Sequence, residues 1–363
     1  MERADLNRPL RRGWTTGTCA AAASRAAYQA LLTGVFPDPV PVLLPGGTRP
    51  SFALAVNDIG QDFARAGVVK DAGDDPDVTH GALIVSTVRL APPNSGVIFR
   101  AGEGVGTVTR PGLPLPPGEP AINPIPREII RTAIAEVAAQ HGGSGDAIVE
   151  LSIPGGEKIA ERTLNSRLGI VGGLSILGTT GVVVPYSCSA WIHSIHRGID
   201  VARAAGLDHV AGTTGATSEA AIAQLYGLPE QALVDMGDFV GGMLKYLRRH
   251  PVPRVTIAGG MAKMTKLGQG LLDLHSRRGE VDLQWLSHAA TEAGGGADLA
   301  VQITQSNSAM EAFGHARTAG IDLPAGVAAS ARKTAAQALG GVMRLEIVIF
   351  DRSGQLLTRT GFH

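Results

Sequence analysis

Three glycine-containing loops carry the residues best suited to bind a ligand. The segments GGLSILGTTG (172–181), AGTTGATSE (211–219) and AGGMAKMTK (258–266) each follow an apolar run. Glycine lets the backbone approach a ligand closely, and the N–H groups at a helix start favour anionic or polar oxygen groups. None of the loops has the GxGxxG or Walker A pattern, so no dinucleotide or nucleoside triphosphate is specified. Tight turns alone remain the alternative explanation for each loop.

We expect the three loops to lie on the same side of one sheet and two of them to hold a cofactor. Asp235 and Asp238 close the following strand, where a carboxylate can accept hydrogen bonds from a ribose; solvated turn carboxylates are the alternative. The expected cofactor-binding residues are Gly172, Gly173, Ser175, Gly178, Thr179, Thr180, Gly181, Gly212, Thr213, Thr214, Gly215, Asp235 and Asp238.

The loop VVKDAGDDPDVTHG (68–81) contains four aspartates, one lysine and one histidine. Aspartates initiate turns, so part of this cluster is explained by turn chemistry. Crowded carboxylates also repel one another, which can raise one pKa enough to make a usable base. The twelve-residue calcium loop with its terminal glutamate is absent, and we expect no protein-bound metal.

The cysteines and histidines give weaker indications of a functional site. Cys19 opens a helix, where a thiol pKa can be lowered, but no histidine or asparagine pattern marks a partner for Cys19 or Cys188. His193 and His196 lie three apart without the HExxH pattern of zinc sites, which favours a structural or substrate-facing role. The segment RRGWTTGTCAAAASRAA (11–27) therefore has three readings: a nucleophile, an anion-binding helix start, or a well-capped, closely packed helix.

Composition narrows the class of protein. A chain of 363 residues exceeds one ordinary core, so two domains are expected. Lys plus Arg and Asp plus Glu both total 32, which gives no basic field for nucleic acid. The N-terminus lacks the apolar core of a signal peptide, and a cytoplasmic protein fits best. The uncharged segment 168–192 is broken by glycines and Pro185, which favours buried strands over a membrane span.

The pattern along the chain predicts a mixed fold. A helix is expected from Gly17 to about Leu32, with Thr16 or Thr18 as N-cap and Gly34 as its stop. Short strands, a proline-rich segment and a second helix follow, which indicates an α+β domain over residues 1–152. From about residue 165 strands and helices alternate, which predicts a Rossmann-like α/β domain with a mostly parallel sheet over residues 153–363. The strand MRLEIVIFD (343–351) could join either sheet.

These motifs together resemble a known family. GWTTGTCAAAASRAA, VVKDAGDDPDVTHGA, GEGVGTVTRPGLPLPPGEPAINPIPR, NSRLGIVGGLSILGTTGVVVP and the turn DMGDF look like the cobalt-precorrin-5B (C-1)-methyltransferase family of cobalamin biosynthesis, often called CbiD. The resemblance implies S-adenosylmethionine as methyl donor, a cobalt-containing tetrapyrrole as acceptor and cobalt-precorrin-6A as product. It also implies an α+β domain, expected to bind the acceptor, beside a Rossmann-like domain, expected to bind the donor.

Methyl transfer of this kind needs two reactants held in line and shielded from water, and no covalent enzyme intermediate. Cys19 is therefore expected to be a small buried side chain. The candidate catalytic residues, which would accept a proton or orient the ring, are Asp74, Asp75 and His80. The acceptor's carboxylates call for cationic and N–H donors; the candidate substrate-binding residues are Thr15, Thr16, Gly17, Lys70, Arg110, Arg127 and Arg167.

Two other classes stay open at this point. The alternating second half also suits a nicotinamide-dependent oxidoreductase, although GxGxxG is missing. A non-catalytic protein that carries a tetrapyrrole is the second alternative. Partners other than a small molecule are not expected, apart from a homo-oligomer, which the sequence leaves open.

Overall fold

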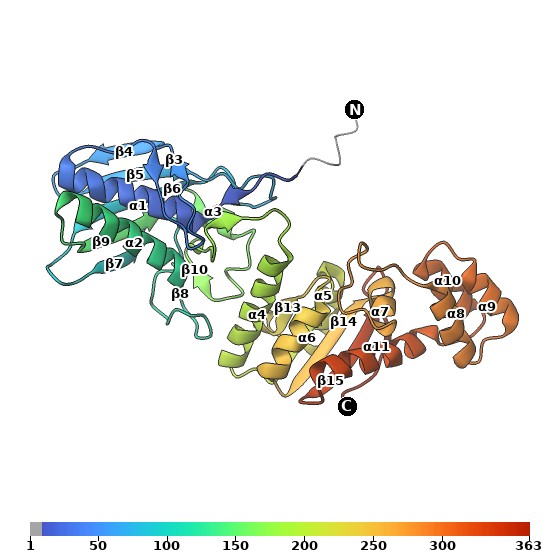
Figure 1. The fold of residues 1–363 in the computed structure, drawn as a ribbon. Helices are drawn as coiled ribbons and strands as arrows, with labels where there is room; N and C mark the ends of the chain where they lie inside the picture. The colour runs from blue at the N-terminus through green and yellow to red at the C-terminus, as the bar shows by residue number, and fades with distance from the viewer. Residues whose placement is uncertain (1–8) are drawn as a thin grey trace. The chain divides into compact units, whose positions relative to one another are not determined.

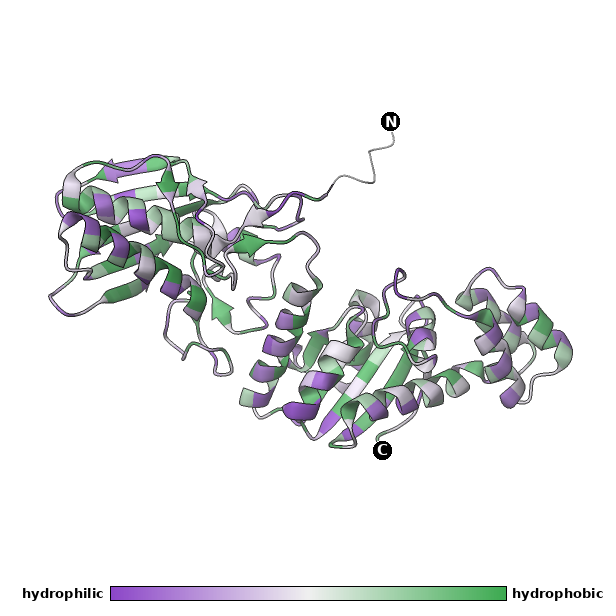
Figure 2. Ribbon diagram, viewed as in Figure 1, coloured by the Kyte–Doolittle hydropathy of each residue, from purple (hydrophilic) through white to green (hydrophobic). Residues whose placement is uncertain are grey.

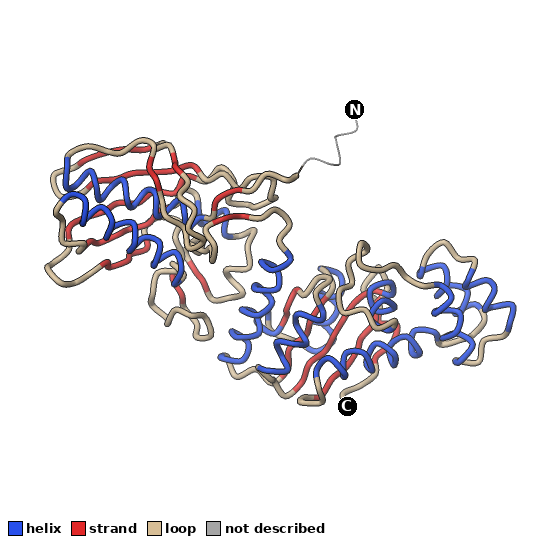
Figure 3. Tube along the Cα trace, viewed as in Figure 1, coloured by secondary structure: helices blue, strands red, loops and turns tan. Residues whose placement is uncertain are grey.

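The computed structural model describes residues 9–363, which divide into two compact units after Ser187. Figure 3 shows that the first unit combines strands with few helices, whereas helices are abundant in the second. The fold is thus mixed α/β, as predicted. The structure divides after Ser187, which is 35 residues beyond the boundary expected after residue 152 (187 minus 152).

The first unit is built on a five-stranded sheet with mixed strand directions. Its order is β4-β5-β6-β9-β7, in which only the β7–β9 pair is parallel. Helices α1 and α2 pack side by side over this sheet (Figure 1). The bounds are β4 (Val56–Ile59), β5 (Ala64–Val69), β6 (Leu83–Leu90), β7 (Val97–Ala101), β9 (Ala147–Ser152), α1 (Thr16–Thr33) and α2 (Pro124–His141).

Helix α1 forms because its sequence supplies a capping residue at each end and an alanine-rich run between them. Thr15 is the N-cap, and its side chain accepts a hydrogen bond from Thr18 N. Gly34 ends the helix with φ 74°, a left-handed conformation that favours glycine. The predicted helix is confirmed, although the cap is Thr15 rather than Thr16 or Thr18. The alanines at 20–23 are fully buried, so the helix lies close against the sheet.

Short two-residue strands explain why the first unit extends to residue 187. β1 (Gly13–Trp14) pairs with β11 (Val182–Val183), and β10 (Ile170–Val171) pairs with β8 (Thr107–Val108). The strands expected within segment 168–192 therefore pair with early segments of the chain and not with the parallel sheet. The remaining small elements are β2 (Val40–Pro41), β3 (Ser51–Phe52) and α3 (Gly156–Ala160).

The second unit has a five-stranded sheet of order β13-β12-β14-β15-β16. The first four strands are parallel, and β16 runs antiparallel to β15. The strand whose sheet could not be predicted is β15, which thus belongs to the second unit. The bounds are β12 (His209–Thr213), β13 (Leu233–Asp235), β14 (Arg254–Gly260), β15 (Arg344–Phe350) and β16 (Leu356–Arg359).

Both faces of this sheet are covered. Ile257 of β14 packs in one apolar cluster with helices α4, α6, α7 and α11, whereas its neighbour Ala258 packs on the other face with Ile222 of α5. Figure 2 shows the apolar character of these strands in green. The helices of this unit are α4 (Cys188–Ala204), α5 (Ala216–Tyr226), the short η1 (Glu230–Ala232), α6 (Val240–Arg249), α7 (Met261–Gly268), α8 (Leu283–Glu292), α9 (Ala297–Thr304), α10 (Ala309–Thr318) and α11 (Leu323–Leu339).

Between residues 9 and 363, no helix combines the length and the apolar character needed to cross a bilayer. The uncharged segment 168–192 forms loops, two short strands and the start of α4.

Candidate functional site

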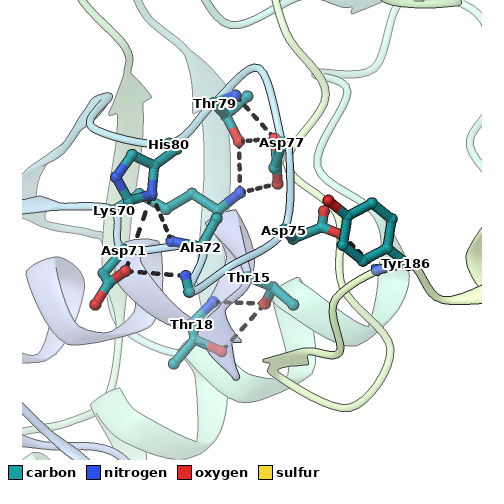
Figure 4. A network of polar contacts seen from close by, with 11 residues as sticks. Thr15, Thr18, Lys70, Asp71, Ala72, Asp75, Asp77, Thr79, His80 and Tyr186 are labelled. Atoms are coloured by element: carbon teal, nitrogen blue, oxygen red, sulfur yellow. Dashed lines mark hydrogen bonds and ion pairs between the residues drawn. The ribbon is translucent and has the colours of Figure 1, made fainter. Parts of the chain in front are cut away.

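Three segments predicted to carry function meet at the N-terminus of α1 in the first unit. Trp14 N donates to Asp71 O at 2.7 Å, Thr15 N to Gly181 O at 3.1 Å, and Gly17 N to Leu177 O at 3.1 Å. The TTGT turn, the acidic loop and the glycine loop 172–181 thus form one cluster (Figure 4). The sequence did not reveal this meeting, because the three segments are far apart along the chain.

The backbone N–H groups of Thr15, Gly17 and Thr18 in the TTGT turn (15–18) donate to acceptors within the protein. Thr15 Oγ1 accepts from Thr18 N at 3.3 Å, and Thr18 Oγ1 donates to Gly181 O at 2.7 Å. Thr15, Thr16 and Gly17 are buried. The turn therefore fixes loop 172–181 on α1, and contact of these three residues with a substrate stays a prediction.

Lys70 is buried inside the acidic loop. Its ammonium group binds Asp77 and the hydroxyl of Thr79, and only 2% of its side chain is exposed. Burial disfavours ionisation of Asp77, but Lys70 and Thr79 hold the pKa of that carboxyl below its usual value. The predicted contact of Lys70 with substrate carboxylates is thus at odds with its position, because its charge is already paired in the interior.

The other three aspartates of the loop also have protein donors. Asp71 accepts from the Arg11 guanidinium, which lowers the pKa of Asp71 to about 2. Asp74 Oδ2 accepts from Arg11 N at 2.6 Å, and Asp75 Oδ1 accepts from Tyr186 N at 2.8 Å. The expectation that crowding raises a carboxyl pKa is wrong for Asp71 and Asp77, because their hydrogen bonds and cationic partners lower the pKa by more than burial raises it. A catalytic role for Asp74 or Asp75 stays a prediction.

His80 is tied to the same loop through its ring. Its Nδ1 accepts a hydrogen bond from Ala72 N at 3.1 Å, which requires an unprotonated Nδ1. The proton of the neutral ring then lies on Nε2, which can donate but not accept. The predicted role of His80 as a base therefore cannot use Nδ1 in this arrangement.

The predicted arginines lie on different parts of the first unit. Arg127 donates to Glu119 and to Ile122 O, each at 2.8 Å, and so ties the proline-rich segment to α2. Arg110 packs against Gly169, two residues from Arg167, which brings these two segments together. Their contact with a substrate stays a prediction.

The glycine loop 172–181 belongs to the first unit, so it does not share a sheet with loop 211–219. Asn165 Nδ2 donates to Gly173 O at 3.1 Å, and the hydroxyl of Ser175 lies 3.4 Å from Asn165 Oδ1. Gly173, Ser175 and Gly181 are buried, whereas Gly172, Thr179 and Thr180 are exposed. The prediction that all three glycine loops lie on one side of one sheet is wrong, because the flanking strands β10 and β11 pair with β8 and β1.

In the second unit a pocket of about 370 Å³ opens at the carboxyl ends of three neighbouring parallel strands. It lies where the chain order reverses, between β12 and β14, which is where open parallel sheets bind ligands. Residues 214–218, 260–263, 308–310 and 350–352 line it. This placement confirms that loops 211–219 and 258–266 meet at one edge of the sheet.

Glycine is the N-cap residue of two helices that line the pocket. α5 follows Gly215 and α7 follows Gly260, and neither glycine offers a side chain to cap the first-turn N–H groups. α10 instead follows Ser308, whose hydroxyl accepts from Glu311 N. The starts of α5 and α7 thus present backbone donors on the pocket wall, an arrangement that favours anionic or polar oxygen groups.

The predicted cofactor residues of this unit have different positions. Thr214 and Gly215 line the pocket, whereas Gly212 and Thr213 are buried in β12. A β-carbon on Gly212 would lie 2.3 Å from Met243 Sδ, so that glycine permits close packing.

The two aspartates near the end of β13 do not belong to the pocket wall themselves. Asp235 accepts from Gly237 N at 3.2 Å, and Asp238 forms an ion pair with Lys263, which does line the pocket. The sequence did not single out Lys263, Ser308, Met310, Asp351 or Arg352. Of these five residues only Lys263 lies in a segment that the sequence indicates as a binding loop, namely loop 258–266.

Neither a nucleophilic thiol nor a metal cluster stands out. Burial of Cys19 raises its pKa to about 12, which confirms the expected buried side chain. Among residues 9–363 no group of three or more His, Cys, Asp or Glu could hold a metal ion. His196 stacks on Tyr246 with ring centroids 3.9 Å apart, a structural contact.

Comparison with known proteins gives consistent matches over the chain. Residues 3–185 match the model of the CbiD family, and residues 273–361 match the model of the CbiD C-terminal domain. A protein of Bradyrhizobium sp. strain BTAi1, named cobalt-precorrin-5B C(1)-methyltransferase, is 64% identical over 98% of this chain and 94% of its own length. One of the same name from Agrobacterium fabrum is 66% identical over 97% of this chain and 93% of its own.

A solved structure is similar as well. The crystal structure of the cobalamin biosynthesis protein CbiD from Archaeoglobus fulgidus matches 86% of this chain and 85% of its own, with 25% sequence identity and a TM-score of 0.40.

Proposed function

The chain belongs to the CbiD family, and we propose that it is a methyltransferase that methylates C-1 of cobalt-precorrin-5B, giving cobalt-precorrin-6A in cobalamin biosynthesis. Support comes from relatives of that name that are 58–66% identical over nearly the full chain. None of these names indicates a nicotinamide-dependent oxidoreductase or a carrier without activity.

We propose S-adenosylmethionine as the donor and the pocket of the second unit as its site. The observation that carries this proposal is the pocket's place at the reversal of strand order, in a sheet that we regard as Rossmann-like. Its volume of about 370 Å³ lies within the usual range for small-molecule sites. Thr214 and Gly215 remain in the proposed donor site, whereas loop 172–181 does not.

We propose that the first unit binds the acceptor. Leu177, Val184 and Tyr186 are large apolar side chains that stay 50%, 47% and 67% exposed. Leu177 lies in loop 172–181, which packs on α1, and Val184 and Tyr186 follow that loop. Such side chains suit the apolar face of a tetrapyrrole. The ring's carboxylates would meet arginines of the same unit, with Arg110 and Arg167 as candidates.

The chain's contribution to the reaction is then mainly positional. The bound donor would supply an electrophilic methyl group, and the acceptor carbon would supply the electron pair of the new C–C bond. The S–CH3 bond would break at the same time, with its electron pair kept by sulfur, which leaves as the neutral thioether S-adenosylhomocysteine. Holding the two in line and excluding water lowers the barrier without an enzyme nucleophile. The buried, protonated thiol of Cys19 agrees with this, because the reaction needs no thiolate.

Transfer of a labelled methyl group from S-adenosylmethionine to purified cobalt-precorrin-5B tests the activity. A labelled product supports the proposed function, whereas binding of the acceptor without transfer would support a carrier. Stabilisation in a thermal-shift assay by NADH or NADPH alone would support the oxidoreductase instead.

The donor site is tested by filling the pocket. Thr217 is exposed on the first turn of α5 and lines the pocket, so Thr217→Trp should block donor binding without disturbing the core. Gln224 is exposed on the same helix outside the pocket, and Gln224→Trp is the matched control. Calorimetry that finds unchanged donor affinity in Thr217→Trp would place the donor elsewhere.

A further inference from the structure

The geometry points to Lys263 as the residue that recognises the carboxylate of the donor's methionine moiety, and to Asp238 as the residue that positions Lys263. The inference rests on the proposed function, since it assigns a role within the proposed donor pocket. The sequence pattern offers either Asp235 or Asp238 for the ribose and gives Lys263 no role.

Lys263 has a donor to offer. It is the third residue of α7 and lines the pocket. Within the described chain its ammonium group binds the carboxylate of Asp238 and the carbonyl of Leu274, the latter at 3.3 Å. An ammonium group has three N–H donors, so one remains for a ligand in the pocket.

The surroundings of Lys263 favour a negative charge. The glycine-capped starts of α5 and α7 add backbone N–H groups and the positive ends of two helix dipoles. The pocket's own carboxylate, Asp351, keeps its charge, and one of its oxygens, Oδ1, accepts from Ser353 Oγ at 2.7 Å and from Gln355 N at 2.9 Å within its own turn. Arg352 is the other cation of the pocket wall.

An amino-acid carboxylate is the one anionic group of S-adenosylmethionine. Lys263 and the backbone donors at the starts of α5 and α7 are therefore the part of the pocket that we expect to bind that group. The apolar side chains of Met261, Met310 and Phe350 line the pocket too and offer the adenosine a different kind of surface.

Asp238 is engaged by the lysine and by the backbone around it. Leu274 N donates to Asp238 O at 2.8 Å, while Leu274 O accepts from Lys263 and, at 3.2 Å, from the buried Lys266. These contacts join the turn after β13 to the start of α7 and hold the Lys263 side chain in place. Asp238 therefore acts through Lys263, and it does not line the pocket itself.

Calorimetry with two ligands that differ only in the carboxylate tests the inference. S-adenosylmethionine and its decarboxylated form share the adenosine, the sulfonium and the amino group. A charge-assisted hydrogen bond contributes about 1.5–3 kcal/mol, so Lys263→Met should raise the Kd of S-adenosylmethionine roughly 10- to 100-fold. The Kd of the decarboxylated ligand should change by less than about threefold. Lys245→Met, an exposed lysine of α6 outside the pocket, is the control.

Asp238→Asn distinguishes between two roles of Asp238, positioning Lys263 and binding the ribose of the donor. A positioning residue predicts weaker binding of S-adenosylmethionine and unchanged binding of the decarboxylated ligand. Equal weakening of both ligands would place Asp238 on the nucleoside and overturn its positioning role.

The remaining outcomes are distinct. Equal loss of both ligands in Lys263→Met, or equal affinity of both for the unaltered protein, overturns the role of Lys263 and leaves the proposed function intact. Failure of the unaltered protein both to bind S-adenosylmethionine and to transfer its methyl group overturns the proposed function itself.

Discussion

Gly178 lies directly over Thr15: a β-carbon on Gly178 would come within 2.3 Å of Thr15 Oγ1. Gly178 also has φ 134°, a conformation that side chains rarely adopt. The contact therefore holds loop 172–181 on the N-cap of α1, and it depends on glycine at this position.

Gly178→Ala should destabilise the first unit by about 2–3 kcal/mol, because the new methyl group clashes with Thr15 and the backbone is strained. Hydrogen exchange should show faster opening of α1, with donor affinity unchanged. Gly172→Ala is the matched control: Gly172 has φ 84° but open space around it, so only backbone strain is added. Equal effects of the two substitutions would mean that the contact contributes nothing.

The buried pair of Lys70 and Asp77 should show strong coupling. Asp77→Asn leaves the Lys70 charge buried without a charged partner and should cost about 3 kcal/mol. Lys70→Met should cost less, since Asp77 is 24% exposed and keeps Thr79 as a donor. Denaturation of both single variants and the double variant gives a coupling energy, expected at roughly 1–3 kcal/mol. Additive effects would show that the ion pair is unimportant.

Asp75 should act through its hydrogen bond with Tyr186 N rather than through its charge. Asp75→Asn keeps an acceptor oxygen and should retain turnover, whereas Asp75→Ala should lose about 1 kcal/mol of stability. Steady-state rates with cobalt-precorrin-5B distinguish the two readings. A large loss of turnover in a stably folded Asp75→Asn protein would restore the catalytic hypothesis for this carboxylate.

His209 should make the second unit sensitive to acid. Burial, reinforced by Arg254, lowers its pKa from 6.5 to about 4. The unfolded chain therefore binds the proton more readily, and the stability contributed by neutral His209 is complete above pH 6.5. It is lost as the pH falls toward 4, by up to about 3 kcal/mol.

Calorimetric melting from pH 7 to pH 4 checks this prediction. His209→Gln can keep a hydrogen bond to Thr256, which His209 Nε2 meets at 2.8 Å, but it cannot titrate. Its melting temperature should fall less steeply with pH than that of the unaltered protein. Parallel profiles for the two proteins would contradict the assignment to His209.

Local signals made part of this fold predictable. Helix α1 was foreseen because its alanines, its threonine cap and Gly34 all act within a few residues of one another. The glycine loops after β12 and β14 were placed correctly at one sheet edge, since strand and helix alternate around both. Cys19, expected to be buried because methyl transfer needs no thiolate, lies on the same closely packed helix and is fully buried.

Long-range pairing was not predictable in the same way. Ile170, Val171, Val182 and Val183 have the composition of buried parallel strands, yet their partners are Val108, Thr107, Trp14 and Gly13. Nothing local distinguishes the two choices of partner. The internal pairing of Lys70 with Asp77 and the meeting of Lys263 with Asp238 depend likewise on how the backbone folds, and a residue's type alone does not reveal whether its charge faces a ligand.

The pairing of β1 with β11 has one more consequence. Because Gly13 lies opposite Val183, the chain enters and leaves the first unit at neighbouring points. A unit closed in this way tolerates circular permutation, since a short linker can join its old ends while new ends open in an exposed turn such as that between β4 and β5. A longer chain can therefore contain the first unit as an insertion, because the two connections to it lie side by side.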